Sequence, residues 1–255
     1  MKKVAFSIVA LAILTLFTAC KNEQTETPTE ETKELAVNDS PVETTETYLY
    51  VTAPSGLTLR EHNNLNSEKL AVMPYGTKLK VIVSETENTM NVGGIDGGMN
   101  KVEYNHKTGF AFNGFLSKFF PPERDMKAKM YVADLQKKFP EASYTESTGG
   151  TASKPTNSET VILPTQNWHE AFYIAQKLYD IPSSFSFPNP KGRDAQTIQN
   201  SNKPEAIFLS DLQIERIDNN LDKIAYVQAG TGYGSSVTLT KQDNTLKIVY
   251  SYVIE

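Results

Sequence analysis

Residues 50–83 read YVTAPSGLTLREHNNLNSEKLAVMPYGTKLKVIV, and residues 100–117 read NKVEYNHKTGFAFNGFLS. Apolar and polar residues alternate in 57–60 and again in 78–84, each time directly after a turn that contains glycine. Such alternation between Gly, Pro and Asn turns is typical of short, half-buried strands. We expect strands at residues 48–52, 57–60, 69–73, 78–84, 100–104 and 108–112. Six short strands at this spacing predict a small β-barrel, which leaves no free sheet edge.

This part of the chain resembles the bacterial SH3-like domain family over about residues 48–120. The matching motifs are the strand GLTLR at 56–60, the turn and strand YGTKLKV at 75–81, and the hairpin 101–110 followed by 114–117. The resemblance implies a domain at 48–121 that folds as a small barrel. It also implies binding to peptidoglycan or to peptides of the cell wall, or a role as a structural adaptor.

The chain departs from this family at the positions of two tryptophans. Met99 stands where the family has a tryptophan before the Lys-Val pair, and Phe110 stands where a second one follows the hairpin glycine. The ligand therefore does not transfer from the family. We expect a ligand groove at Tyr50, Arg60, Tyr75, Met99, Tyr104, Phe112 and Phe115. The alternative for each aromatic residue is a place in the barrel core. The insertion 85–98, with four glycines, is expected to be a loop with little packing.

The first residues have the features of a secretory signal. Lys2 and Lys3 precede an apolar run at 4–19 that is too short for a membrane span. Residues 17–20, FTAC, resemble a lipobox, which implies a signal peptide at 1–19 and a lipid on Cys20. The alternative is an ordinary signal peptide in which Cys20 is incidental. A lipidated Cys20 would carry several acyl chains, and their joint insertion would anchor the chain stably in a membrane. We therefore expect a bacterial cell envelope protein, held extracytoplasmically by its lipid at the outer membrane or cell surface.

Charge is distributed unevenly along the chain. Residues 22–47 have a net charge of −7, while residues 48–255 have a net charge of −1. A segment so acidic and so poor in apolar residues predicts a disordered tether over residues 20–47. The nearly neutral remainder lacks the clustered cations that binding to nucleic acid requires. Because Cys20 is the single cysteine, disulfides, cysteine nucleophiles and cysteine-based zinc sites are excluded elsewhere.

Residues 122–255 predict an α+β domain of no family that we recognise. Pro121 and Pro122 mark its start. We expect a helix at 123–138, a loop at 143–160, a helix at 168–180 and an irregular connection at 182–204. Asn167 and Glu170 have the spacing of a capping box at the second helix. Strands at 207–217, 223–229, 235–241 and 246–254 predict an antiparallel meander that this helix covers on one face. The whole chain is thus expected to be mainly β, with an α+β part.

No catalytic residue, metal site or cofactor site is expected. The glycines of 230–236 precede a strand and not a helix, which favours a hairpin loop over a phosphate loop. The spacing of the three His–Glu pairs is wrong for metal ligands; these pairs are His62 with Glu61, His106 with Glu103, and His169 with Glu170. Two functions remain open. One is a non-enzymatic envelope lipoprotein that binds peptidoglycan, a peptide or a partner protein, and the other is a cell-wall hydrolase with its active site in 122–255.

Overall fold

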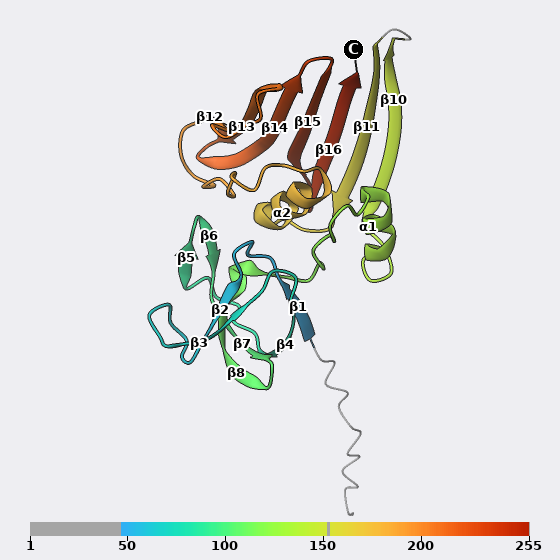
Figure 1. Cartoon of the computed structure of the whole chain (residues 1–255). Helices are drawn as coiled ribbons and strands as arrows, with labels where there is room; N and C mark the ends of the chain where they lie inside the picture. Colours follow the sequence, from blue (N-terminus) through green and yellow to red (C-terminus); the bar gives the residue numbers. More distant parts are fainter. Residues whose placement is uncertain (1–46, 152–153, 255) are drawn as a thin grey trace, which may run out of the picture. The chain divides into compact units, whose positions relative to one another are not determined.

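The computed structural model describes residues 47–151 and 154–254, which belong to one compact unit (Figure 1). The predicted signal peptide, Cys20 and the predicted tether up to residue 46 lie outside the described residues. Within the described ranges, no helix has both the length and the apolar character needed to cross a membrane.

The first sheet is built from residues 47–117. Its seven strands are all antiparallel and follow the order β3-β2-β8-β7-β4-β1-β9. They are β1 Thr47–Val51, β2 Leu57–Arg60, β3 Lys69–Met73, β4 Lys78–Val83, β7 Met99–Tyr104, β8 Lys107–Phe112 and β9 Leu116–Ser117, with a 3-10 turn η1 at Asn113–Phe115 before β9. The six expected strands are confirmed to within one residue at each end. Among the described pairings none joins β3 to β9, so the closed barrel remains a prediction.

The expectation of a loop at 85–98 is wrong, because part of it forms a hairpin. Strand β5, Met90–Val92, pairs with β6, Ile95–Gly97, across a Gly93-Gly94 turn. Both glycines have a positive φ, which is the backbone that a two-residue hairpin turn requires. Ile95 is buried and the Asn91 amide donates to the Asp96 carboxylate over 2.7 Å. Apolar contacts of Ile95, Met90 and Val92 with the core, together with this polar cross-strand pair, thus order the segment.

Gly109 of β8 lies where the backbone of β2 approaches most closely. A Cβ at this position would lie 2.6 Å from the Arg60 carbonyl oxygen and 2.9 Å from Leu59 Cγ. Gly109→Ala is therefore expected to lower the free energy of unfolding by about 1–3 kcal/mol, as overpacking does in a filled core. Urea denaturation measures this loss. Gly149→Ala is the control, because an added Cβ there meets no atom within 4 Å. Equal midpoints for the two variants would contradict the prediction.

The second sheet contains the strands after residue 142, again all antiparallel, in the order β10-β11-β16-β15-β14-β13-β12. They are β10 Ser143–Thr151, β11 Lys154–Leu163, β12 Ala195–Gln199, β13 Ile207–Ile217, β14 Asn220–Gly230, β15 Tyr233–Gln242 and β16 Thr245–Ile254. The predicted four-strand meander is confirmed as β13 to β16. The loop expected at 143–160 is wrong, since it belongs to the β10–β11 hairpin. The connection expected at 182–204 contains β12, the edge strand.

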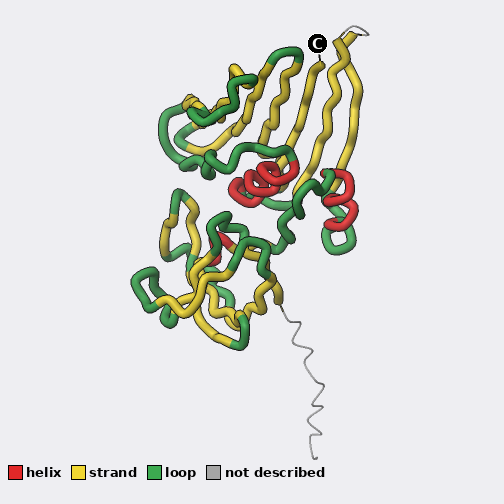
Figure 2. The backbone as a smooth tube through the Cα atoms, viewed as in Figure 1, coloured by secondary structure: helices red, strands yellow, loops and turns green. Residues whose placement is uncertain are grey.

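Two helices lie near one end of these strands (Figure 2). Helix α1, Ala128–Leu135, is shorter than expected and begins after an extended Lys127; helix α2, Trp168–Leu178, contacts β15 and β16. The capping box expected at α2 is wrong, because the expected bonds between side chains and backbone N–H groups do not form. The Asn167 side chain makes no capping hydrogen bond, and its amide donates instead to the buried Glu170 carboxylate over 3.3 Å. The expected contact of this helix with the meander is found at β15 and β16.

Candidate functional site

Two adjoining hollows lie between the first sheet and the segment around α2. One, here called the Met99 pocket, has a volume of about 430 Å³, and its floor and walls include Arg60, Leu65, Met99, Phe112, Phe115, Gln176 and Phe185. The other, here called the Tyr75 pocket, has a volume of about 720 Å³ and is lined by Tyr50, Tyr75, Phe120, Arg124, Lys177 and Asp180, among others. Both pockets are also lined by Pro54, Gln176 and Ser183. They are therefore neighbours, and together they are called the groove.

Six of the seven residues predicted to bind a ligand line this groove. Arg60, Met99, Phe112 and Phe115 line the Met99 pocket, and Tyr50 and Tyr75 line the Tyr75 pocket. The seventh, Tyr104, lines neither pocket and packs against the hydrophobic core. The fold thus brings six of the predicted residues to two neighbouring hollows. Tyr104 instead packs against the core, which was the alternative given for each aromatic residue.

Met99 and Phe112 at the bottom of the Met99 pocket are also residues of the hydrophobic core. Met99 and Phe112 are each 3% exposed, and they face each other across β7 and β8. The Phe115 ring meets the Phe112 ring edge-on, with 5.6 Å between the ring centroids. Met99 therefore provides a flexible apolar floor in place of the flat indole that the family resemblance implies.

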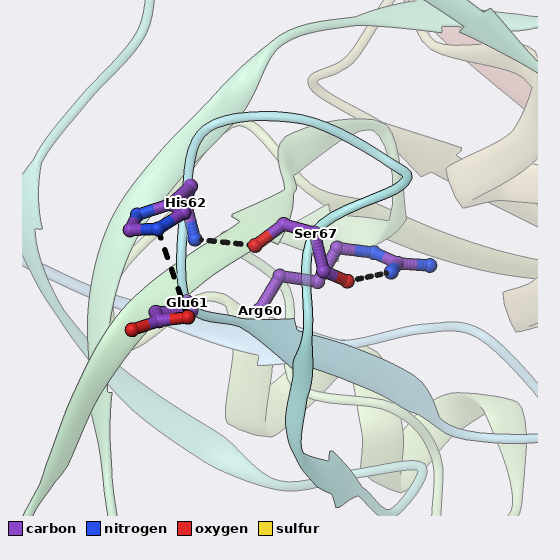
Figure 3. A network of polar contacts seen from close by, with 4 residues as sticks. All are labelled: Arg60, Glu61, His62 and Ser67. Atoms are coloured by element: carbon purple, nitrogen blue, oxygen red, sulfur yellow. Dashed lines mark hydrogen bonds and ion pairs between the residues drawn. The ribbon is translucent and has the colours of Figure 1, made fainter.

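Arg60 holds the loop that forms one lip of the Met99 pocket. Its guanidinium donates from Nη1 to the Ser67 carbonyl oxygen over 2.8 Å, and the Ser67 hydroxyl accepts from the His62 backbone N–H over 2.8 Å (Figure 3). On the outside of the same loop, the exposed His62 Nε2 lies 3.6 Å from the Glu61 carboxylate. Leu65, at the tip, is 37% exposed and lines the pocket. The loop thus presents an apolar side chain at the rim.

The opposite wall of the pocket depends on Gln176, which sequence reasoning missed. Gln176 is buried in α2, and its amide donates to the carbonyl oxygens of Pro182 and Phe185 over 3.1 and 2.9 Å. These two bonds shape the chain after α2 so that Phe185 and Ser186 reach the pocket. The available signal was a glutamine on the otherwise apolar face of a predicted helix, since a buried amide needs partners.

The two pockets differ in charge. Among the described residues that line the Met99 pocket, Arg60 is the one charged side chain. The Tyr75 pocket is lined by both acids and bases, and Lys177 Nζ lies 5.1 Å from the Tyr75 ring centroid. Burial raises the pKa of the Tyr75 hydroxyl well above its usual value, so this phenol stays neutral. The groove therefore has an apolar end with one cation and a polar end with mixed charges.

The described histidine and carboxylate side chains are spread over both sheets and α2. No group of three or more His, Asp or Glu side chains in these ranges has the geometry to hold a metal ion. His169 lies edge-on to Phe187 with 5.9 Å between the ring centroids, and burial lowers its pKa to about 4. Burial thus keeps His169 in its neutral form at neutral pH.

Comparison of the chain with models of protein families and with curated proteins gave no match. The function is therefore inferred from the sequence motifs and from the geometry of the site.

Proposed function

We propose that the chain is a non-enzymatic, lipid-anchored protein of the bacterial cell envelope whose SH3-like module binds a peptide in the groove. The favoured ligand is a peptide of peptidoglycan, and a peptide segment of a partner protein is the other form of the same proposal. The observation that supports it is that six residues selected from sequence line two adjoining hollows. The proposed lipid on Cys20 would keep the groove close to the envelope.

The chemistry of the Met99 pocket favours a ligand with small apolar groups and a carboxylate. Its floor is apolar, and Arg60 uses one N–H in the hydrogen bond to Ser67, which leaves other guanidinium N–H groups for a ligand. Guanidinium groups bind carboxylates through paired hydrogen bonds. Peptides of peptidoglycan combine carboxylates with small apolar side chains, which suits this pocket.

Co-sedimentation with purified peptidoglycan sacculi tests this proposal. The soluble chain of residues 21–255 is expected to be retained, and a bulky residue at the pocket rim should block retention. Ser186→Trp places such a residue at an exposed position of the rim, and we expect at least tenfold weaker binding, about 1.4 kcal/mol. Ser201→Trp, in an exposed turn outside both pockets, is the matched control.

The outcomes separate the two open functions. Retention that Ser186→Trp abolishes and Ser201→Trp preserves supports binding in the groove. Equal retention of both variants, or no retention of the unchanged chain, overturns binding of the wall in this pocket. Release of soluble wall fragments over time would instead favour the hydrolase with its active site in residues 122–255.

A further inference from the structure

One face of the second sheet continues beyond the part that α2 covers. Close to α2, this face carries an apolar row of cross-strand partners, Val161, Ile248, Leu239, Ile224 and Ile214, which are at most 1% exposed. Four residues further along β16 the row is polar, and it aligns Asn157, Tyr252, Ser235, Gln228 and Ser210. The change from apolar to polar occurs on one continuous surface, so the outer part of this face is not built as core.

A hollow of about 390 Å³ lies on this outer part and is here called the tyrosine pocket. It is lined by Tyr179, Asp180, Gln228, Tyr233, Ser235, Tyr250 and Tyr252, together with Gly234 and Val253. The Tyr250 ring is stacked on two other tyrosine rings. Its centroid lies 4.8 Å from that of Tyr179 and 5.7 Å from that of Tyr252. None of these residues lines the groove except Asp180, which borders both hollows.

The polar groups around the tyrosine pocket are held in place before any ligand arrives. The Tyr226 hydroxyl donates to the Gln228 side-chain oxygen over 2.8 Å, and the Gln228 amide donates to the Tyr233 hydroxyl over 3.1 Å. The Tyr179 hydroxyl is buried, and the Glu159 carboxylate is its polar neighbour. The fold itself thus positions the polar side chains at the pocket.

The charge at this pocket is negative. Asp180 lines it, and the Glu159 carboxylate faces Tyr250 across β11 and β16. Burial, and then the charge of Glu159, raises the pKa of Tyr179 and of Tyr250. Glu146 lies directly opposite Glu159 in β10. Burial, and then the charge of Glu146, raises the pKa of Glu159, while the Tyr179 hydroxyl and then Lys127 lower it. No lysine or arginine is among the described residues that line the pocket.

We propose that the tyrosine pocket binds an organic ammonium group, namely the side-chain amine of a lysine-type residue in a peptide. Phenol rings attract cations through their π-electrons, and the hydroxyl oxygens and carboxylates accept hydrogen bonds from an ammonium group. The charge of the pocket complements that of an ammonium ion and would repel a carboxylate. This site lies apart from the Met99 pocket, so its occupation does not depend on the function proposed for the groove.

Titration of the soluble chain of residues 21–255 with Nα-acetyl-lysine methylamide tests this proposal, with tyrosine ring resonances observed by NMR. We expect saturable shifts of the Tyr250 and Tyr252 rings that weaken as salt is added. The Nε-acetylated form of the same probe, which lacks the charge, is expected to bind at least fivefold more weakly. Asp180→Asn is expected to weaken binding of the charged probe about two- to fivefold. Asp222→Asn, at an exposed acid outside the pocket, is the control and should change nothing.

Three results would overturn the proposal. One is the absence of saturable shifts with the charged probe, and another is equal binding of the charged and acetylated probes. The third is binding of a neutral N-acetylglucosamine trimer to the same rings with higher affinity than the lysine probe, which would assign the pocket to glycans. A loss of binding in Asp180→Asn with no loss in Asp222→Asn supports it.

Discussion

Arg216→Ala is expected to lower the free energy of unfolding by about 2–4 kcal/mol, the largest loss we predict for a single side chain. Arg216 is 3% exposed on β13. Among the described residues no carboxylate pairs with it, and its guanidinium instead donates to the carbonyl oxygens of Asn189, Pro190 and Arg193 and to the Gln196 side chain. Hydrogen bonds from a charged donor each contribute about 1.5–3 kcal/mol, and their loss is not additive.

The physical reason is that Arg216 ties the irregular connection after α2 to the sheet. Phe185 and Phe187 anchor the first part of this connection in the core, whereas residues 191–194 are exposed. Without the guanidinium, the carbonyl groups return to water and the connection loses its attachment to β13. Arg216→Lys should recover only part of the loss, because an ammonium group has three donors and lacks the planar fork of five.

Urea denaturation followed by circular dichroism measures this effect through the midpoint of unfolding. Arg193→Ala is the matched control, since it removes an exposed arginine of the same connection but keeps the carbonyl that Arg216 uses. We expect this control to change stability by less than about 0.5 kcal/mol. A loss in Arg216→Ala no larger than that of Arg193→Ala would contradict the role given to Arg216.

The second large effect is a dependence of stability on pH that arises at His169. Burial lowers the pKa of His169 from 6.5 to about 4. Between these values the unfolded chain binds a proton at this position and the folded chain does not, so stability falls as the pH drops from about 6.5 to about 4. At 1.36 kcal/mol per pKa unit, the loss over this window is on the order of 2–3 kcal/mol.

His169→Gln isolates this contribution, because glutamine does not titrate. Glu159 acts in the opposite direction: its pKa is raised, so its protonation stabilises the folded state as the pH falls. The difference in unfolding free energy between the two proteins, measured from pH 7 to pH 4, cancels Glu159 and every other shared group. We expect this difference to change across the window, and a difference that stays constant would show that His169 does not titrate as described.

Much of the first sheet was predictable because its strands alternate between apolar and polar residues. Leu57 and Leu59, and likewise Leu79 and Val81, point to one side of the sheet and are buried. The β5–β6 hairpin was missed because its strands have only three residues each and Ile95 is their one fully buried apolar side chain, although the Gly-Gly turn is itself a hairpin signal.

The strands β10 and β11 could not be read from the same signal. Residues 145–151 of β10 are exposed and are mostly Ser, Thr, Gly and Glu, so no apolar alternation marks them. They are ordered by pairing over nine residues with β11, which in turn pairs with β16 at the end of the chain. The pairing of β11 with β16 joins residues that are far apart in the sequence, and such contacts leave no local pattern.

The candidate site was predictable only in part, because only one of its walls comes from local sequence motifs. Its aromatic residues and Arg60 lie within recognisable motifs of the first sheet, whereas the opposite wall depends on Gln176 and on the chain that follows α2. The tyrosine pocket was missed because Tyr179, Tyr233 and Tyr250 are separated by tens of residues and meet only through strand register and the end of a helix.

The most direct test of the proposed function is an NMR titration of the soluble chain with a peptidoglycan stem peptide whose amino groups are acetylated. Acetylation removes the ammonium groups that the tyrosine pocket is proposed to bind, so the groove alone is tested. We predict saturable shifts of backbone resonances around Leu65, Phe115 and Ser186, and their loss in Ser186→Trp. Shifts that cluster outside the groove, or that persist unchanged in Ser186→Trp, would contradict peptide binding in the Met99 pocket.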